Sequence, residues 1–148
     1  MTAPIRPSHV GLCVSDLDRS LRFYCDGLGF QVAEGYDLDD TMLDGLDRAL
    51  ETPGTVRMRS QMITHGDLKV ELLYFLEPLA SGTPSARRNQ LGFTHLSFHV
   101  DDVERVAARL VELGGTIIPS TRAVLGVPVV FLADPDGTRV ELMGLTNP

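Results

Sequence analysis

Two histidines and two glutamates occupy matching places in this sequence and have the chemistry of a metal site. His9 and His95 each open a run of alternating apolar and polar residues, and Glu71 and Glu141 each lie inside a Val-Glu-Leu triplet. Successive side chains of a strand point to opposite faces, so each polar side chain faces away from its apolar neighbours. Imidazoles and carboxylates together suit Zn, Ni, Co, Mn or Fe. We therefore predict that these four residues converge on one face as metal ligands.

An internal repeat supports this prediction. The segment HVGLCVSDLDRSLRFY, from His9, aligns without a gap with HLSFHVDDVERVAARL, from His95, at an offset of 86 residues. The two Val-Glu-Leu triplets are offset by 70, so the first copy holds 16 more residues between its His and its Glu. A lone His or Glu on an alternating strand is usually solvated or hydrogen-bonded. Two of each at equivalent positions of a repeat favour a shared role.

Each copy has the pattern of a strand, a helix and three further strands. In the first copy we expect a strand at 8–14, a helix capped by Ser15 and ended by Gly27 and Gly29, and strands at 30–36, 55–64 and 68–76. In the second we expect a helix capped by Asp101, with Glu104 in the capping-box position, and strands at 116–118, 127–133 and 138–143. This pattern predicts an α+β fold of two βαβββ modules.

Length and composition predict one domain. The 148 residues are 43% hydrophobic and 22% charged, as in ordinary globular chains. We expect module one at about 5–77, a Gly/Pro/Ser-rich linker at about 78–92 and module two at about 93–145. The extra residues of the first copy fall at about 37–53, as a short helix or a substrate lid or as an ordinary surface excursion.

Charge and hydropathy argue against several partners. The net charge is −7 with no basic cluster, so we expect no nucleic acid partner. The adjacent Arg87 and Arg88 lie in the linker and are interpreted as a solvated loop. No apolar run approaches the ~20 residues of a membrane span, and the first residues lack an apolar signal core. We expect a cytoplasmic protein without a membrane partner.

The chain resembles the vicinal oxygen chelate superfamily, which includes glyoxalase I, methylmalonyl-CoA epimerase, extradiol dioxygenases and fosfomycin-resistance thiol transferases. The segments that carry the resemblance are HVGLCVSDLDRSLRFYCDGLGF, KVELLYF, FTHLSFHVDDV and FLADPDGTRVEL. The resemblance implies an open, concave mixed barrel built from the two modules around a divalent metal ion. It also implies a small-molecule substrate and, in many members, a homodimer.

The ligand set resembles that of bacterial-type glyoxalase I, whose order of His, Glu, His, Glu falls on His9, Glu71, His95 and Glu141. Methylmalonyl-CoA epimerases more often have Gln at the second place. Extradiol dioxygenases and the thiol transferases use two His and one Glu. The 16-residue excess is not part of a compact glyoxalase I.

The resemblance implies a metal-dependent lyase or isomerase of glyoxalase type. The ion would stabilise an enediolate while Glu71 or Glu141 accepts and returns a proton. The alternatives are an acyl-CoA epimerase, an extradiol dioxygenase or thiol transferase, and a non-catalytic resistance protein that only binds its ligand. His99 shares a face with His95 and either lines the pocket or is a packed or hydrogen-bonded residue.

Overall fold

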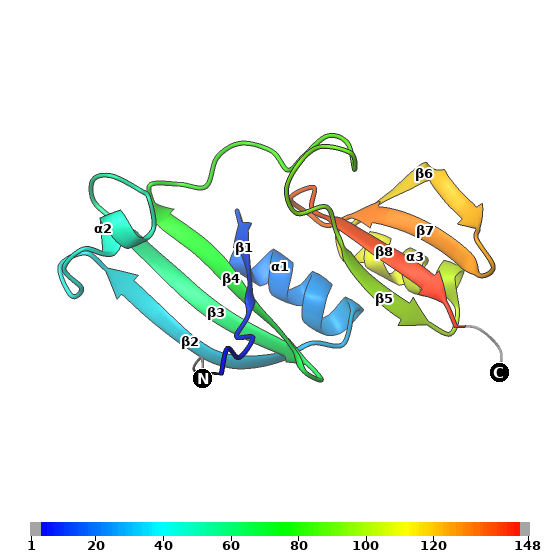
Figure 1. Ribbon diagram of the computed structural model, residues 1–148, viewed down its shortest axis with the longest axis horizontal. Coiled ribbons are helices and arrows are strands. Elements are labelled where there is room, and N and C mark those ends of the chain that lie inside the picture. Colours follow the sequence, from blue (N-terminus) through cyan, green and yellow to red (C-terminus); the bar gives the residue numbers. More distant parts are fainter. Residues whose placement is uncertain (1–3, 146–148) are drawn as a thin grey trace. The chain divides into compact units, whose positions relative to one another are not determined.

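The chain forms two four-stranded sheets of the same construction (Figure 1). The computed structural model describes residues 4–145, so the ends of the predicted domain, 1–3 and 146–148, lie outside it. The first sheet contains β1 (Val10–Val14), β2 (Gln31–Asp39), β3 (Arg57–His65) and β4 (Leu68–Glu77). The second contains β5 (Leu96–Val100), β6 (Thr116–Val124), β7 (Pro128–Ala133) and β8 (Arg139–Gly144). The helices are α1 (Leu17–Leu21), its π-helical continuation η1 (Arg22–Gly27), α2 (Leu46–Ala49) and α3 (Val103–Glu112).

The two sheets share one topology. Their strand orders are β1-β4-β3-β2 and β5-β8-β7-β6, and in each the first pair is parallel and the others are antiparallel. The register is also repeated, because Gly11 lies opposite Glu71 just as Ser97 lies opposite Glu141. The predicted α+β fold of two βαβββ modules is confirmed.

Each sheet has one buried apolar face and one face that carries its glutamate. Val70 and Leu72 are fully buried on either side of Glu71 in the chain. Val140 and Leu142 are likewise fully buried around Glu141. Alternation along the strands therefore puts each glutamate on the opposite side of its sheet, which we call the glutamate face.

The chain divides into two compact units, and the helical residues 18–28 of the first sequence copy belong to the second unit. The first unit combines the chain up to Leu17 with Gly29–Ser81, and the second combines Asp18–Leu28 with the chain from Gly82 onward. Within the second unit the Tyr24 hydroxyl donates to Asp134 Oδ2 at 2.7 Å. The helix also approaches β6 closely, since a Cβ on Gly115 would lie 2.8 Å from the Phe23 ring. The helix of the first sequence copy is therefore built into the second unit.

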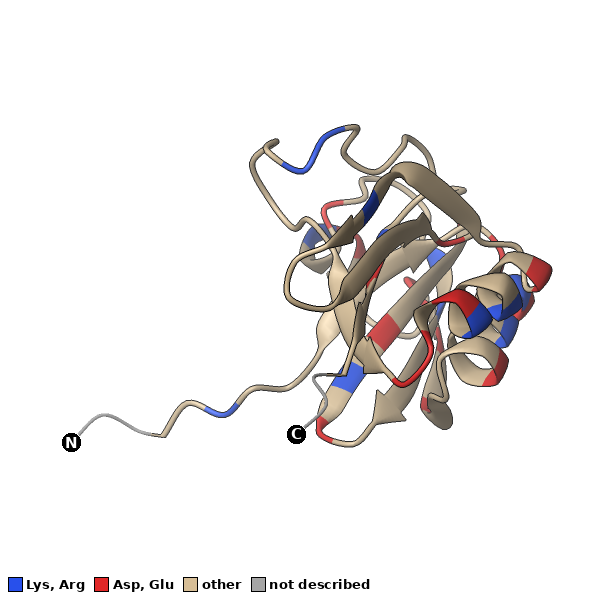
Figure 2. Cartoon of the chain, turned by 90° about the vertical axis from the view of Figure 1, so that its right-hand side faces the viewer, with Lys and Arg blue, Asp and Glu red and all other residues tan. Residues whose placement is uncertain are grey.

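The helix of the second copy, α3, begins one residue later than expected. Asp102, not Asp101, is its N-cap, because its backbone is extended and its Oδ1 accepts the Arg105 N–H at 3.0 Å. Asp101 instead accepts from the Arg105 guanidinium at 2.8 Å. Exposed charges of both signs continue along α3 (Figure 2), where Arg109 pairs with Glu112.

Two strands run several residues longer than the sequence pattern predicts. β6 continues to Val124 instead of ending at 118, with a register shift between Ile118 and Ala123. Thr121 bridges this irregularity, since its hydroxyl donates to Ile118 O and accepts from Phe131 N. Such a bulge hides the period-2 pattern from the sequence. β2 likewise continues to Asp39. Within residues 4–145, no helix is long and apolar enough to cross a membrane.

Candidate metal site

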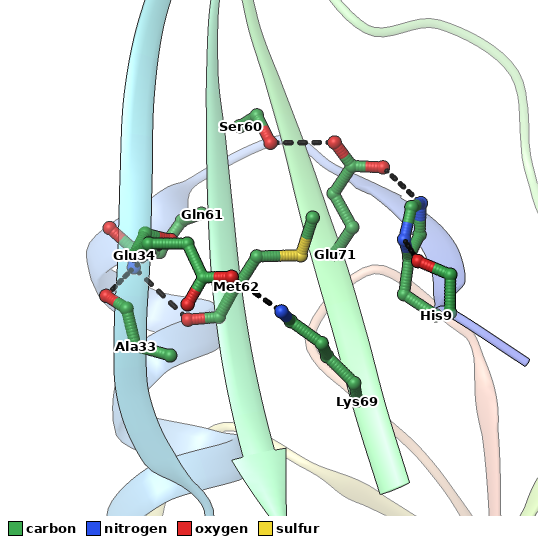
Figure 3. Close-up of polar contacts among 9 residues, drawn as sticks. His9, Ala33, Glu34, Ser60, Gln61, Met62, Lys69 and Glu71 are labelled. Carbon is green, nitrogen blue, oxygen red and sulfur yellow. Dashed lines mark hydrogen bonds and ion pairs between the residues drawn. The ribbon is translucent and has the colours of Figure 1, made fainter.

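The first His–Glu pair, His9 and Glu71, lies where β1 begins beside β4. His9 directly precedes β1, and its Nε2 lies 3.0 Å from Glu71 Oε2. Figure 3 shows Glu71 held between His9 and Ser60, whose hydroxyl donates to Glu71 Oε1 at 2.6 Å. The Ser8 hydroxyl lies 2.8 Å from the other ring nitrogen, Nδ1. The side chains of His9 and Glu71 are 33% and 18% exposed, so the pair is half-buried and remains accessible to a ligand.

The second His–Glu pair, His95 and Glu141, repeats this arrangement. His95 directly precedes β5, and its Nε2 lies 3.5 Å from Glu141 Oε2. The Thr94 hydroxyl lies 2.7 Å from His95 Nδ1. The Ser97 hydroxyl donates at 2.6 Å to Glu141 Oε2, the same oxygen that faces the imidazole. Among the described residues, none makes a hydrogen bond or ion pair with Glu141 Oε1, whereas both oxygens of Glu71 are engaged.

Each pair fits two ligands of a divalent ion. Two ligand atoms about 2.1 Å from one ion are roughly 3.0 Å apart at a right angle and roughly 3.4 Å apart at the tetrahedral angle. The observed 3.0 and 3.5 Å match these separations. A hydroxyl that accepts from a protonated Nδ1 leaves the Nε2 lone pair for the ion, which is the usual arrangement for a ligating imidazole.

The four predicted ligands are placed as two pairs, one in each unit. The structure brings His9 to Glu71 and His95 to Glu141. In the part of the chain from 4 to 145, no three His, Cys, Asp or Glu side chains form a group that could hold an ion. A centre of four ligands therefore stays a prediction. The observed geometry supports each of the two His–Glu pairs as a pair of ligands.

The residues inserted in the first copy lie on the glutamate face of the first sheet. Leu46 of α2 packs with Val56 and Met58, and Leu73 and Phe75 of β4 contact this cluster. Leu73 follows Glu71 by two residues and so shares its face. The short helix expected within 37–53 is present, and its Leu46 is only 8% exposed. The insertion is thus anchored beside Glu71 by apolar contacts.

A hollow of about 490 Å³ opens next to this insertion. Its lining residues are Gly35, Tyr36, Asp37, Leu38, Met42 and Leu43. Tyr36 lies opposite Ser60, the residue that donates to Glu71, so both side chains are on the glutamate face. Clefts of this volume and apolar lining are typical of small-molecule sites.

Around the second pair, the linker supplies a residue that the sequence analysis missed. Phe131 lies directly opposite Glu141, and its ring meets the His95 imidazole edge-on with centroids 5.1 Å apart. The Arg88 guanidinium carbon lies 4.1 Å from the centroid of the same ring. Arg87 and Arg88 are both exposed, as expected of a loop, but Arg88 also stacks on the glutamate face of the second sheet. The linker has no periodicity from which this contact could be predicted.

His99 also lies on this face, because it is opposite Met143, two residues after Glu141. Its side chain is exposed. The position is compatible with a pocket residue, and that role stays a prediction.

Comparisons with known proteins support a family assignment. The family described as "Glyoxalase/Bleomycin resistance protein/Dioxygenase superfamily" matches residues 6–142. An ethylmalonyl-CoA/methylmalonyl-CoA epimerase from Cereibacter sphaeroides is 30% identical over 93% of this chain and 96% of its own. A lactoylglutathione lyase from Pseudomonas aeruginosa is 28% identical over 92% of this chain and 80% of its own. A glyoxalase family protein from Bacillus cereus shares the fold, with a TM-score of 0.80 at 19% identity over 97% of this chain and 95% of its own.

Proposed function

The chain belongs to the Glyoxalase/Bleomycin resistance protein/Dioxygenase superfamily, and we propose that it is a metal-dependent lyase or isomerase acting on a small molecule. The reaction would begin by removing a proton from the carbon next to a carbonyl. The observation that carries the proposal is the repeated His–Glu pair with a hydroxyl behind each imidazole and each carboxylate. The named relatives include a lyase and an epimerase, whose reaction types share this first step.

We infer that His9, Glu71, His95 and Glu141 together hold one divalent ion, which is Zn, Ni, Co, Mn or Fe. When bound, the ion would supply the positive charge that stabilises an enediolate. Ser8 and Thr94 would keep the imidazoles oriented through Nδ1, and Ser60 and Ser97 would orient the carboxylates. The hydroxyls thereby restrict the rotation of all four side chains.

Glu141 is the better candidate for the residue that accepts the proton. A general base needs an oxygen that can reach the substrate. Both oxygens of Glu71 are engaged, one by Ser60 and the other by His9. In Glu141 the hydroxyl and the imidazole share Oε2, which leaves Oε1 available. We assign Glu71 to holding the ion only, and Glu141 to holding it through Oε2 and moving the proton through Oε1.

We also propose a cytoplasmic homodimer. Because the His–Glu pairs belong to different units, a complete site would combine the pairs either within one chain or between two copies. Light scattering after size-exclusion chromatography, with and without the ion, would give the oligomeric state.

Solvent deuterium exchange tests the reaction. Hemithioacetals and 2-methyl-branched acyl-CoA thioesters would be incubated with the protein in D₂O, and the α-deuterium measured by mass spectrometry. We expect Glu141→Gln to lower exchange at least 100-fold and Glu71→Gln to lower the bound metal. Glu112→Gln, which makes the same change on the exposed face of α3, should do neither.

An acyl-CoA epimerase is the second candidate, favoured by the 30% identity to such an enzyme over 96% of its length. Exchange into an acyl-CoA thioester without net conversion would favour it over a lyase. A protein that only binds its ligand would keep its ligand affinity and show no exchange in any variant. Exchange that persists after chelation, or metal analysis without any bound divalent ion, would reject the metal-dependent mechanism.

A further inference from the structure

Arg88 occupies a distinctive place beside the second His–Glu pair. Its guanidinium lies over the Phe131 ring, whose edge contact reaches the His95 imidazole. The two distances laid end to end put the guanidinium carbon within about 9 Å of the imidazole centre. The attraction between a cation and the face of a ring favours this position of the Arg88 side chain. One small substrate could therefore contact Arg88 and approach the second pair together.

The linker holds Arg88 in this place. Ser85 accepts a hydrogen bond from Arg139 of β8 at 3.2 Å. Pro84 lies near Gly137, in the turn before the same strand. Because the segment is fixed on both the strand and the turn, part of the entropy of ordering Arg88 is already lost before a ligand binds.

Among the residues that the structure describes, no carboxylate forms an ion pair with Arg88. Within residues 4–145, the ion pairs between a basic side chain and a carboxylate involve Arg19, Arg57, Arg59, Lys69, Arg105, Arg109 and Arg122. None of the described carboxylates pairs with Arg88, although the chain carries a net charge of −7. A guanidinium stacked on a ring keeps its N–H edge free for planar anions, which it binds in a bidentate manner.

We propose that Arg88 binds an anionic group of the substrate, a carboxylate or a phosphate, and so positions the reacting carbonyl at His95 and Glu141. The role of Arg88 in positioning a reacting carbonyl rests on the proposed function. The binding of an anion by Arg88 does not. It narrows the substrate class to carbonyl compounds that carry a second, anionic end. Arg88 is a positioning residue in this scheme and takes no part in proton transfer.

Two matched probes test the carboxylate. 2-Oxoglutarate and 2-oxovalerate offer the same vicinal oxygens and chain length, but only the first has a distal carboxylate. Binding would be measured by calorimetry on protein loaded with Ni²⁺. We expect 2-oxoglutarate to bind about tenfold more tightly than 2-oxovalerate, and Arg88→Met to remove that difference while leaving 2-oxovalerate binding unchanged. Arg88→Lys should recover part of it, and Arg87→Met, which changes the neighbouring linker arginine, should alter neither affinity.

Adenosine 3′,5′-bisphosphate tests whether the anionic group that Arg88 binds is a phosphate. If Arg88→Met weakens this probe and spares both oxo acids, the group is a phosphate. If Arg88→Met weakens the binding of all three probes equally, Arg88 acts only by covering Phe131, and the proposal is wrong. The proposal is also wrong if Arg88→Met changes the binding of none of them. Failure of the proposed function has a different signature, because exchange that survives Glu141→Gln would reject the reaction while leaving the Arg88-dependent affinity difference intact.

Discussion

The hydrogen bond from Tyr24 to Asp134 is one of the contacts between residues 18–28 and the rest of the second unit. Tyr24→Phe removes the hydroxyl that donates it. Both side chains are buried, with 0% and 3% exposure. The hydroxyl donates to Asp134 Oδ2 at 2.7 Å, while Oδ1 accepts the backbone N–H groups of Asp136 and Thr138. The substitution keeps the ring and its edge contact with Phe23. A hydrogen bond to a buried carboxylate contributes about 1.5–3 kcal/mol, so we expect the free energy of unfolding to fall by about 2 kcal/mol at neutral pH.

The loss should depend on pH in a defined direction. Burial raises the pKa of the Asp134 carboxyl, and the hydrogen bonds from Tyr24 and from the backbone of Thr138 and Asp136 partly oppose this. A carboxyl whose pKa is raised by folding favours the folded state most when protonated, and that stability is lost as the pH rises through the folded pKa. Without the Tyr24 hydroxyl the pKa of Asp134 rises further, so the variant loses more stability at neutral pH than at acid pH.

Urea unfolding followed by circular dichroism at pH 7 and pH 4 measures both effects. Tyr36→Phe, at an exposed tyrosine of the first unit, should leave the unfolding free energy within about 0.5 kcal/mol of the wild type. In an Asp134→Asn background the carboxylate is absent, so Tyr24→Phe should cost less and show no pH dependence from this site. A loss of equal size at both pH values, or a loss that is undiminished in the Asp134→Asn background, would refute the electrostatic reasoning.

Three further predictions concern the site. Thr94→Val removes the hydroxyl at His95 Nδ1 and should weaken Ni²⁺ binding about 10- to 100-fold, measured by competition with a fluorescent chelator. The control Thr116→Val, at the exposed start of β6, should leave Ni²⁺ binding unchanged. Leu46→Ala should lower the free energy of unfolding by about 2 kcal/mol in urea, because Leu46 is buried against Met58, while Met42→Ala at an exposed position should change it by less than about 0.5 kcal/mol. Removing metal with EDTA should abolish deuterium exchange and adding back a divalent ion should restore it; activity that resists EDTA would contradict the proposed role of the ion.

The faces on which the two glutamates lie could be predicted from the sequence, because they depend on local pattern and on the repeat. Alternation puts Glu71 and Glu141 opposite the buried valines and leucines, and the structure has them there. The parallel pairing of the first and last strands of each module then brings each histidine to the glutamate of its own copy. The alternation has a period that can be counted in the sequence, whereas the parallel pairing is a property of the sheet and is known from the structure.

The features that were not predicted depend on contacts that leave no pattern in the neighbouring sequence. Asp101 and Asp102 are adjacent and chemically identical, so only the backbone conformation decides which one caps α3. Residues 18–28 are attached to the second unit by contacts such as those of Tyr24 with Asp134 and Arg19 with Asp136, which are 110 and 117 residues apart in the chain. Arg88 lies in a segment rich in Gly, Pro and Ser, where composition indicates a loop but not the ring on which it stacks.

The two copies differ in one hydrogen bond, and this difference gives a duplicated site two distinct halves. In the first copy the supporting serine comes from β3 and engages the glutamate oxygen that does not face the histidine. In the second copy it comes from β5 and engages the oxygen that does. A carboxylate held at both oxygens resists rotation and suits a permanent ligand, whereas one held at a single oxygen can turn its other oxygen to a proton. A repeat of identical halves would offer two equivalent carboxylates. In the proposed mechanism, the position of the serine hydroxyl is what distinguishes Glu141, the base, from Glu71.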